Sequence, residues 1–359
     1  MFLKKLTLLQ FKSYEEQSFE FSERINFILG NNGTGKTNIL EAIYFLCLTK
    51  SFSGLSDTQL IKHEAQFFLL NAWIDDLALV SSMKEGHRKQ LTINKQAYEK
   101  LSEHIGKFPV VFVSPNDHDF IRDASDSRRK LLDELFCQVS KEYLSHLQEF
   151  NKILKQRNQL LKQFKEKNFF DFDLLQVYTE QMCTHHVFIA NFRKQNLEIL
   201  SVKTQNYYIK LSNNHEKIAL NYNSQETFSE EDFLKAAQNS LEKDRILQRS
   251  NIGCHKDDYE FLIDEFPLKK YGSQGQQKSF MLSLQLAKYE FLMDKSNKKP
   301  FLLLDDVFDK LDINRVHSLL KIVSSDDFGQ IFITDASKDR TIGFTQDITC
   351  DYKLLEIRS

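Results

Sequence analysis

The sequence predicts an α/β protein whose α/β lobe is discontinuous, because a mainly helical second lobe is inserted into it. Residues 25–46 combine a short apolar stretch, a glycine-rich turn and a helix-patterned segment. Residues 301–306 form an apolar run that ends in two aspartates. Between Asp126 and Leu200 there is no glycine or proline, and apolar residues recur at helical spacing. We therefore expect lobe I at residues 1–120 plus 251–359 and lobe II at 121–250.

Composition limits the function classes. The 359 residues are 41% hydrophobic and 27% charged with a formal net charge of −2, so a surface for a polyanion has to be a local patch. Five widely spaced cysteines without a C-x-x-C pair are typical of reduced thiols. The first residues alternate apolar and charged side chains, and no run approaches the length of a membrane span. We expect a cytoplasmic protein with no membrane partner.

Alternating apolar and polar residues and short apolar runs predict the strands. Heptad spacing of apolar residues predicts a helical arm. The arm, a short helical hairpin, occupies about residues 140–200. A seam of Leu147, Phe150, Leu154, Leu161 and Phe164 runs along its first helix and is broken only by Arg157, and its turn lies near Lys167–Asp171. The second helix runs from Leu174 towards Leu200, and a further helix is expected at Glu230–Arg249. The expected strands are Lys5–Gln10, Ile25–Leu29, Phe67–Ile74, Val110–Val113, Tyr207–Leu211, Tyr259–Ile263, Phe301–Leu304 and Gln330–Thr334.

The glycine-rich turn fits a phosphate-binding loop of the Walker A type. It consists of Gly30, Asn31, Asn32, Gly33, Thr34, Gly35, Lys36, Thr37 and Asn38. Its glycines let backbone N–H groups and the start of the following helix point at an anion. Lys36 is expected to reach the β- and γ-phosphates of ATP, and the Thr37 hydroxyl to ligate Mg²⁺. Spacing, lysine, hydroxyl and flanking elements all agree, which disfavours a chance glycine-rich turn.

The two aspartates fit the Walker B position. Ligand chemistry in open α/β sheets lies at the carboxyl ends of strands. Asp305 is expected to hold Mg²⁺, and Asp306 to position or deprotonate an attacking water. Many ABC-type ATPases have Glu at the second place, so the shorter Asp predicts slow hydrolysis. Taken alone, two acids after an apolar run are often only a solvated strand end.

A third motif separates ABC-type ATPases from other phosphate-loop proteins. Ser273, Gln274, Gly275 and Gln276 stand immediately before an apolar-periodic helix, within a signature segment at residues 271–286 that we expect to lean on lobe II. They resemble the S-x-G-Q core of the ABC signature, which completes the ATP site of a second protomer. The predicted fold is therefore an ABC-type head that dimerises on ATP. Asp312 fits the D-loop acid near that interface. By itself S-x-G-Q is only a polar helix cap.

Two further positions match the motifs of ABC proteins less well. Asn116 follows a strand where ABC proteins carry the Q-loop glutamine, but no Gln stands there. Thr334 and Asp335 stand where many relatives have a switch histidine, and no His stands there.

Several stretches resemble the RecF family of bacterial recombination and repair proteins. The opening Leu6–Tyr14 is similar to the first strand of RecF and SMC-type ATPases, with Lys12 where Arg is frequent. Residues 127–133, SRRKLLD, resemble the R-R-x-x-L-D stretch, and residues 154–158, LKQRN, the arm motif of the family. Residues 253–258, GCHKDD, resemble its G-P-H-R-D-D turn. Asp309 departs from the Ser that is often found in the D-loop.

The resemblance implies a two-lobed ABC head without a long coiled coil. It implies an ATP-dependent homodimer on double-stranded DNA near single-strand gaps and junctions, with slow, DNA-stimulated ATP hydrolysis as a dimerisation switch. It also implies work with RecR and RecO in loading RecA during DNA repair, replication restart and the SOS response.

The arm offers a basic stripe for DNA. Residues 145–168 contain six Lys or Arg against two Glu, a local charge of +4. Lys152, Lys155, Arg157 and Lys162 are the candidate phosphate contacts. On charge alone a solvated helix face is the more frequent meaning of such a stripe, so DNA binding depends mainly on the resemblance.

Three alternatives share some motifs. A transporter nucleotide-binding subunit normally lacks the basic arm and the gap of 237 positions between Lys36 and Ser273. A phosphate-loop kinase predicts fast phosphoryl transfer and no role for Ser273. A structural SMC-like protein requires a far longer coiled coil.

Overall fold

The computed structural model describes residues 1–114, 116–117, 119–212, 216–225 and 227–357, which fall into two compact units. Unit 1 comprises Met1–His118, Asn206–His215 and Ser273–Ser359, and unit 2 comprises Asp119–Gln205 and Glu216–Gly272. Residues 251–272, expected in the α/β lobe, thus belong to unit 2, because their strand pairs there with another strand of unit 2. Within the described residues, no helix is both long and apolar enough to cross a membrane.

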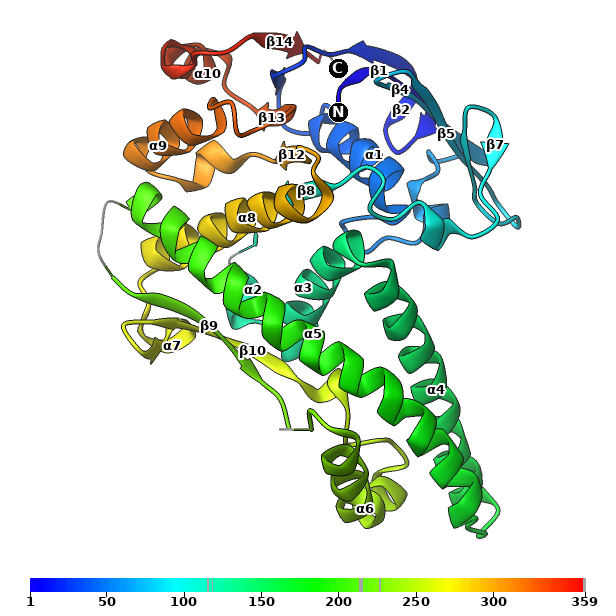
Figure 1. Ribbon diagram of the computed structural model, residues 1–359. Helices are drawn as coiled ribbons and strands as arrows, with labels where there is room; N and C mark the ends of the chain where they lie inside the picture. The colour runs from blue at the N-terminus through cyan, green and yellow to red at the C-terminus, as the bar shows by residue number, and fades with distance from the viewer. Residues whose placement is uncertain (115, 118, 213–215, 226, 358–359) are drawn as a thin grey trace. The chain divides into compact units, whose positions relative to one another are not determined.

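Unit 1 combines two sheets (Figure 1). A six-stranded antiparallel sheet has the order β2-β1-β4-β5-β6-β7, and a five-stranded parallel sheet has the order β14-β3-β13-β12-β8. The strands are β1 (Leu3–Phe11), β2 (Tyr14–Glu20), β3 (Ile25–Leu29), β4 (Phe67–Ile74), β5 (Leu77–Lys84), β6 (Gln90–Ile93), β7 (Gln96–Ala97), β8 (Val110–Val113), β12 (Phe301–Leu304), β13 (Ile331–Asp335) and β14 (Tyr352–Glu356). The helices are α1 (Lys36–Leu48), α8 (Gln274–Ser296), α9 (Ile313–Val323) and α10 (Lys338–Phe344).

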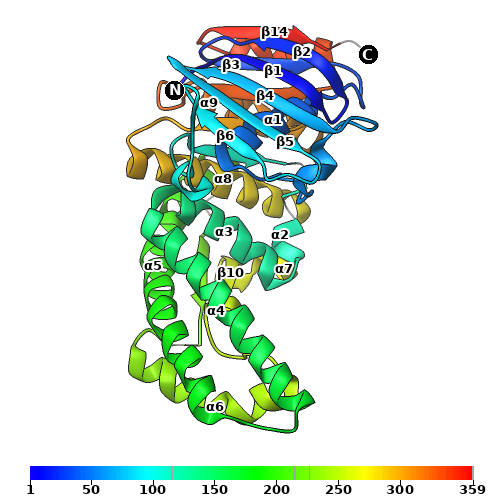
Figure 2. The ribbon, with the colours of Figure 1, turned by 90° about the vertical axis from the view of Figure 1, so that its right-hand side faces the viewer.

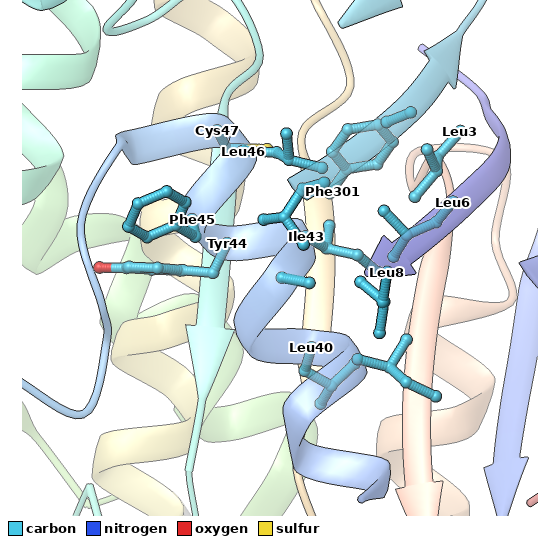
Figure 3. Packing of buried hydrophobic residues seen from close by; sticks show 14 of the residues in the cluster. Leu3, Leu6, Leu8, Leu40, Ile43, Tyr44, Phe45, Leu46, Cys47 and Phe301 are labelled. Carbon is cyan, nitrogen blue, oxygen red and sulfur yellow. The ribbon is translucent and has the colours of Figure 1, made fainter. Parts of the chain in front are cut away.

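Helix α1 fills the space between the two sheets. It contacts β5 of one sheet and β8 and β13 of the other, and Figure 2 shows it against the blue and cyan strands. Its buried side chains meet Leu3, Leu6 and Leu8 of β1 and Phe301 of β12 (Figure 3). Every residue from Ile39 to Leu48 is buried, as expected for a helix covered on all sides. The phosphate loop therefore leads into a helix that is held firmly on all sides.

Unit 2 is mainly helical and contains α2 (Asp119–Arg122), α3 (Ser125–Val139), α4 (Lys141–Glu166), most of α5 (Phe172–Ser212), α6 (Glu230–Leu247) and α7 (Leu268–Tyr271). Its antiparallel sheet has the order β11-β10-β9, formed by β9 (Ile218–Asn223), β10 (Asp258–Ile263) and β11 (Phe266–Pro267). α4 and the first part of α5 form the arm (Figure 1). Arg157 Nε donates to Thr179 Oγ1 between the two helices at 3.1 Å. The turn and the helix at Glu230 lie where the sequence predicts them.

The predicted strand at Tyr207–Leu211 is wrong, because α5 continues through it to Ser212. A short apolar run with aromatic residues is ambiguous between strand and helix. The buried residues are Thr204, Tyr207, Tyr208 and Leu211, a helical spacing that extends beyond the run itself.

A buried histidine of unit 2 makes acid destabilising. His186 Nε2 donates to the Thr227 carbonyl oxygen at 2.8 Å, while its Nδ1 is buried without a hydrogen bond among the described residues. Burial lowers the pKa of His186 to about 4. Because the unfolded imidazole binds its proton near pH 6.5, its contribution to stability is complete above pH 6.5 and is lost as the pH falls towards 4.

We expect the free energy of unfolding to fall with pH in that window, with a slope of up to about 1.4 kcal/mol per pH unit from this imidazole. Urea titrations between pH 7 and 4 measure the slope. His186→Gln should give a shallower slope than the wild type, whereas substitution of the exposed His63 should leave it unchanged. Equal slopes for wild type and His186→Gln would refute the assignment.

Candidate nucleotide-binding site

The candidate site lies at the carboxyl edge of the parallel sheet. β3, β13 and β12 are parallel neighbours, so the segments that follow them emerge at the same edge. The phosphate loop follows β3 and Asp305–Asp306 follow β12, while Thr334–Asp335 are the last two residues of β13. The sheet thus brings together motifs as far apart in the chain as Gly30 and Asp335.

The phosphate loop leads directly into α1. Gly35 has φ 97°, and a Cβ there would lie 2.8 Å from Ser13 Oγ, so both the backbone conformation and the space require glycine. No side chain caps the start of α1 among the described residues. The Asn38 N–H donates to the Gly35 carbonyl oxygen at 2.9 Å, so the N–H groups of Lys36 and Thr37 are the ones at the start of the helix that can donate to an anion, and the helix dipole favours negative charge there.

Lys36 lies across the same loop. Its Nζ donates to the carbonyl oxygens of Gly30 at 2.8 Å and of Asn31 at 3.1 Å, and the residue is almost fully buried. These bonds hold the ammonium group over the N–H groups of the loop. A phosphate at the start of α1 would meet a fixed cation as well as backbone donors.

The opening motif of the chain supports this loop from the side. Tyr14 donates its hydroxyl to the Gly35 carbonyl oxygen at 3.2 Å, and Ser13 Oγ accepts from Asn38 Nδ2 at 2.8 Å. Lys12 forms an ion pair with the fully buried Glu41 of α1 at 3.1 Å. Burial raises the pKa of Tyr14 to about 12, so the hydroxyl remains a donor. This packing gives the K-S-Y motif a physical role.

Asp305 links the strand ends. Its carboxylate accepts from Thr37 Oγ1 at 2.9 Å and from Thr334 Oγ1 at 2.8 Å. Burial raises the pKa of Asp305, while the two hydroxyl donors oppose that rise. The carboxylate and the Thr37 hydroxyl are hard oxygen donors of the kind that Mg²⁺ prefers, so these residues fit the predicted metal position.

Thr334 is a positioning residue that motif matching did not define. Its hydroxyl oxygen accepts from the Asp306 backbone N–H at 2.8 Å as well as donating to Asp305. It therefore orients both aspartates from the neighbouring strand. The side chain stands where the sequence lacks a switch histidine.

Asp306 carries an acceptor atom that makes no hydrogen bond among the described residues. Its backbone has φ 43°, and its Oδ1 is buried without a hydrogen bond among the described residues. Burial, followed by the nearby carboxylates of Asp309 and Asp335, raises the pKa of Asp306, and Lys36 opposes the rise. A carboxylate with a raised pKa is a better proton acceptor than an ordinary one.

Arg340 of α10 joins the segments around Asp306. Its guanidinium forms ion pairs with Asp309 and with the buried Asp335. Asp335 also accepts from Thr341 Oγ1 at 2.7 Å. Sequence reasoning missed Arg340, because only the fold places α10 beside both carboxylates.

The signature and the D-loop lie next to each other. Ser273 caps α8, accepting from the Gln276 N–H at 3.3 Å, and Asp312 caps α9, accepting from the Arg315 N–H at 3.1 Å. Arg315 forms an ion pair with Asp312, and its guanidinium would lie 3.4 Å from a Cβ at position 275. Gly275 thus allows Arg315 to approach the start of the signature helix.

The Q-loop candidate is only partly described. Asn116 is exposed, and its N–H donates to Ser114 Oγ at 3.2 Å, while Pro115 and His118 lie outside the described residues. The buried Gln285 of α8 donates its Nε2 to Asp117 instead. This contact ties the signature helix to the loop after β8, and the sequence did not single it out.

The chain is related over its full length to curated bacterial proteins. The DNA replication and repair protein RecF of Cytophaga hutchinsonii is 41% identical, with 99% of this chain and 95% of that protein covered. This chain belongs to the RecF family. RecF of Flavobacterium johnsoniae is 40% identical over 99% of this chain and 100% of its own length. The family model described as RecF/RecN/SMC N terminal domain matches residues 2–110.

Solved structures also match this chain. The recombination mediator protein RecF-ATPrS in the RecFOR pathway has a TM-score of 0.89 and 30% identity, over 99% of this chain and 96% of that one. The Smc head domain of Pyrococcus furiosus, at TM-score 0.56 and 16% identity, shares the fold. The predicted ABC-type α/β head and the RecF resemblance are confirmed. Full-length membership of the RecF family also removes the transporter and kinase alternatives.

The remaining RecF motifs have structural roles in unit 2. Arg193 is the residue that ties them together. Its guanidinium pairs with both oxygens of Asp133 at 2.9 Å, with Asp257 at 3.0 Å and with the Cys254 carbonyl oxygen at 2.8 Å. Arg128 forms a bidentate pair with Asp258 at 2.8 and 2.9 Å. Residues 127–133 and 253–258 therefore interlock.

The RecF arm motif is also structural, and the expectation that Arg157 contacts DNA is wrong. Arg157 is 3% exposed, and it donates to Asp244 and to Ser250 Oγ, each at 2.7 Å. Asn158 accepts from the Ser250 N–H at 2.7 Å. A guanidinium that is buried in an ion pair with a carboxylate cannot also contact a DNA phosphate. Lys152, Lys155 and Lys162 are exposed and remain candidates.

Proposed function

We propose that this chain is an ATP-binding and DNA-binding protein of recombinational repair and replication restart, in which ATP controls dimerisation. The observation that carries the proposal is the set of contacts at the sheet edge. Lys36 lies over the phosphate loop, and Asp305 accepts hydrogen bonds from both Thr37 and Thr334. The solved relatives described as RecF-ATP and RecF-ATPrS support ATP as the nucleotide.

In this proposal the phosphates of ATP bind at the start of α1. Gly30–Asn38 provide N–H donors, and Lys36 turns from the loop carbonyls to the β- and γ-phosphates. Thr37 and Asp305 are the residues that would hold Mg²⁺, whose charge would offset that of the phosphates. Thr334 keeps the Asp305 carboxylate oriented.

Hydrolysis is expected to be slow. Asp306 would accept a proton from, or orient, the attacking water, and its raised pKa and free Oδ1 support that role. The short side chain reaches less far than a glutamate. A weak, DNA-stimulated ATPase is suited to switching an assembly on and off.

The dimer would complete the site. Ser273–Gln276 and Asp312 lie close together through Arg315, so one surface could present both to the ATP of a second protomer. ATP then lies between two subunits, and its hydrolysis weakens their contact.

The family resemblance supports the proposed DNA substrate and partners. We propose double-stranded DNA next to single-strand gaps and junctions as the binding target. RecR, and RecO with it, are the proposed partners in loading RecA, in line with the RecFOR pathway of the solved relatives.

Lys36→Met tests the switch. Loss of a charged phosphate contact is expected to weaken nucleotide binding about tenfold to a hundredfold, since such a bond contributes about 1.5–3 kcal/mol. ATP-dependent dimers and tight binding to a gapped duplex should be lost with it. Fluorescence anisotropy with a gapped duplex, with and without ATP and Mg²⁺, measures binding, and light scattering measures the oligomeric state.

Lys5→Met is the matched control, because Lys5 is an exposed lysine on β1. It should behave like the wild type. Nucleotide-independent DNA binding by the wild type, or a Lys36→Met protein that still dimerises with ATP, would contradict the proposal.

A further inference from the structure

Four basic side chains gather on unit 2 from separate segments of the chain. They are Arg129 of α3, Lys243 of α6, Arg249 just after α6, and Lys256 of the short helix Cys254–Lys256, and they are called the basic cluster here. Arg129 donates to the carbonyl oxygen of Asp257, the residue after Lys256. His255 Nε2 donates to the Ser250 carbonyl oxygen at 3.1 Å, which places the chain after Arg249 against that before Lys256.

The carboxylates adjacent to the basic cluster point inward. Asp244, next to Lys243, is buried and pairs with Arg157 at 2.7 Å. Asp257, next to Lys256, is buried and pairs with Arg193 at 3.0 Å, and Asp258 pairs with Arg128. These acids are engaged by buried or half-buried arginines of the interior. In the part of the chain that the structure describes, none of them forms an ion pair with the lysine beside it in sequence.

Three of the four members of the basic cluster face solvent. Lys243, Arg249 and Lys256 are exposed, and among the described residues their side chains have no hydrogen bond or ion pair. Arg129 is half-buried and has Asp126 at 3.5 Å, a carboxylate that it shares with Lys130. Burial and the neighbouring Arg249 and Arg129 lower the pKa of Lys256, and the buried Asp244 opposes that shift. Positive charge collected on one surface in this way favours an anionic ligand.

We propose that the basic cluster is a contact site for the phosphate backbone of DNA. The inference rests on the proposed function and names the surface that function would use. Guanidinium and ammonium groups spread over an open surface fit a chain of phosphates and read no sequence. They present more free charge than Lys152 on the arm, which is paired with Glu149 at 2.9 Å.

The double variant Arg249→Gln/Lys256→Gln tests the basic cluster in the full-length chain. With ATP and Mg²⁺ present, its affinity for a gapped duplex is expected to fall about tenfold or more. The slope of log K against log[salt] should become shallower by about 2, because each lost phosphate contact contributes about 0.9. ATP-dependent dimerisation should be unchanged. The melting temperature should stay the same or rise, since repulsion is removed.

Lys217→Gln/Lys270→Gln is the matched control, with the same charge change at two exposed lysines of unit 2 that are not among the charged neighbours of Lys256. A variant that binds with wild-type affinity and slope would overturn the inference and leave an acidic protein as the partner of this surface. An equal loss in the control would overturn it too. Absence of DNA binding by the wild type would overturn the proposed function together with the inference.

Discussion

Arg193→Met is expected to lower the free energy of unfolding of unit 2 by about 3–5 kcal/mol, the usual effect of removing one partner of a buried ion pair. Arg193 is 1% exposed, and it is the cation shared by Asp133 and the buried Asp257. Burial already raises the pKa of Asp257, and Arg193 is the first group that opposes the rise. Methionine fills similar volume but leaves both carboxylates without their cation. Urea denaturation followed by circular dichroism measures the change.

Arg245→Met provides the comparison for this measurement. Arg245 forms a surface ion pair with Glu242 at 2.7 Å, and pairs of this kind contribute about 0–1 kcal/mol. A loss below about 1 kcal/mol for Arg193→Met, equal to that of the control, would mean that the network is not a main source of stability. The two RecF motifs that it joins would then need another explanation.

Ser273→Arg is expected to abolish ATP-dependent dimers while leaving ATP binding by the monomer intact. Ser273 caps α8, and its loss as a cap costs only about 1 kcal/mol, so the helix should persist. In the proposed dimer the hydroxyl contacts the ATP of the partner, where an arginine side chain does not fit. Equilibrium binding of a fluorescent ATP analogue and sedimentation velocity separate the two properties.

Ser229→Arg is the matched control, since Ser229 caps α6 in the same way, accepting from the Asp232 N–H at 3.1 Å. It removes an equivalent cap in unit 2 and should leave dimerisation unchanged. ATP-dependent dimers that survive Ser273→Arg would rule out the proposed use of the signature between subunits.

The candidate nucleotide site could be proposed from the sequence because its residues form local motifs. A strand, three glycines, Lys36 and Thr37 form one continuous segment, and the aspartates directly follow an apolar strand. Parallel strands end at the same edge, so the pairing of Thr37 with Asp305 follows from the fold class. The sequence also indicates that Arg157 is buried, because this residue interrupts an apolar seam. A charged residue at a seam position faces the neighbouring helix, and Arg157 is buried in the structure.

Thr334, Arg340 and Gln285 could not be assigned in this way. Each acts on a group that is distant in sequence, and nothing in their local pattern identifies the partner. The same is true of Arg193, which is one charged residue of a long polar helix until the fold places it between Asp133 and Asp257.

The sequence by itself determined the ABC-type head, the membership of the RecF family and the residues of the phosphate loop and strand ends, because short segments with strict spacing encode them. Only the tertiary structure decided which charges are free. Arg157, Arg128 and Arg193 are neutralised inside unit 2, whereas Arg249 and Lys256 remain exposed. The physical reason is that burial and counter-ions depend on segments that meet only in the folded chain, and charge along the sequence does not record them.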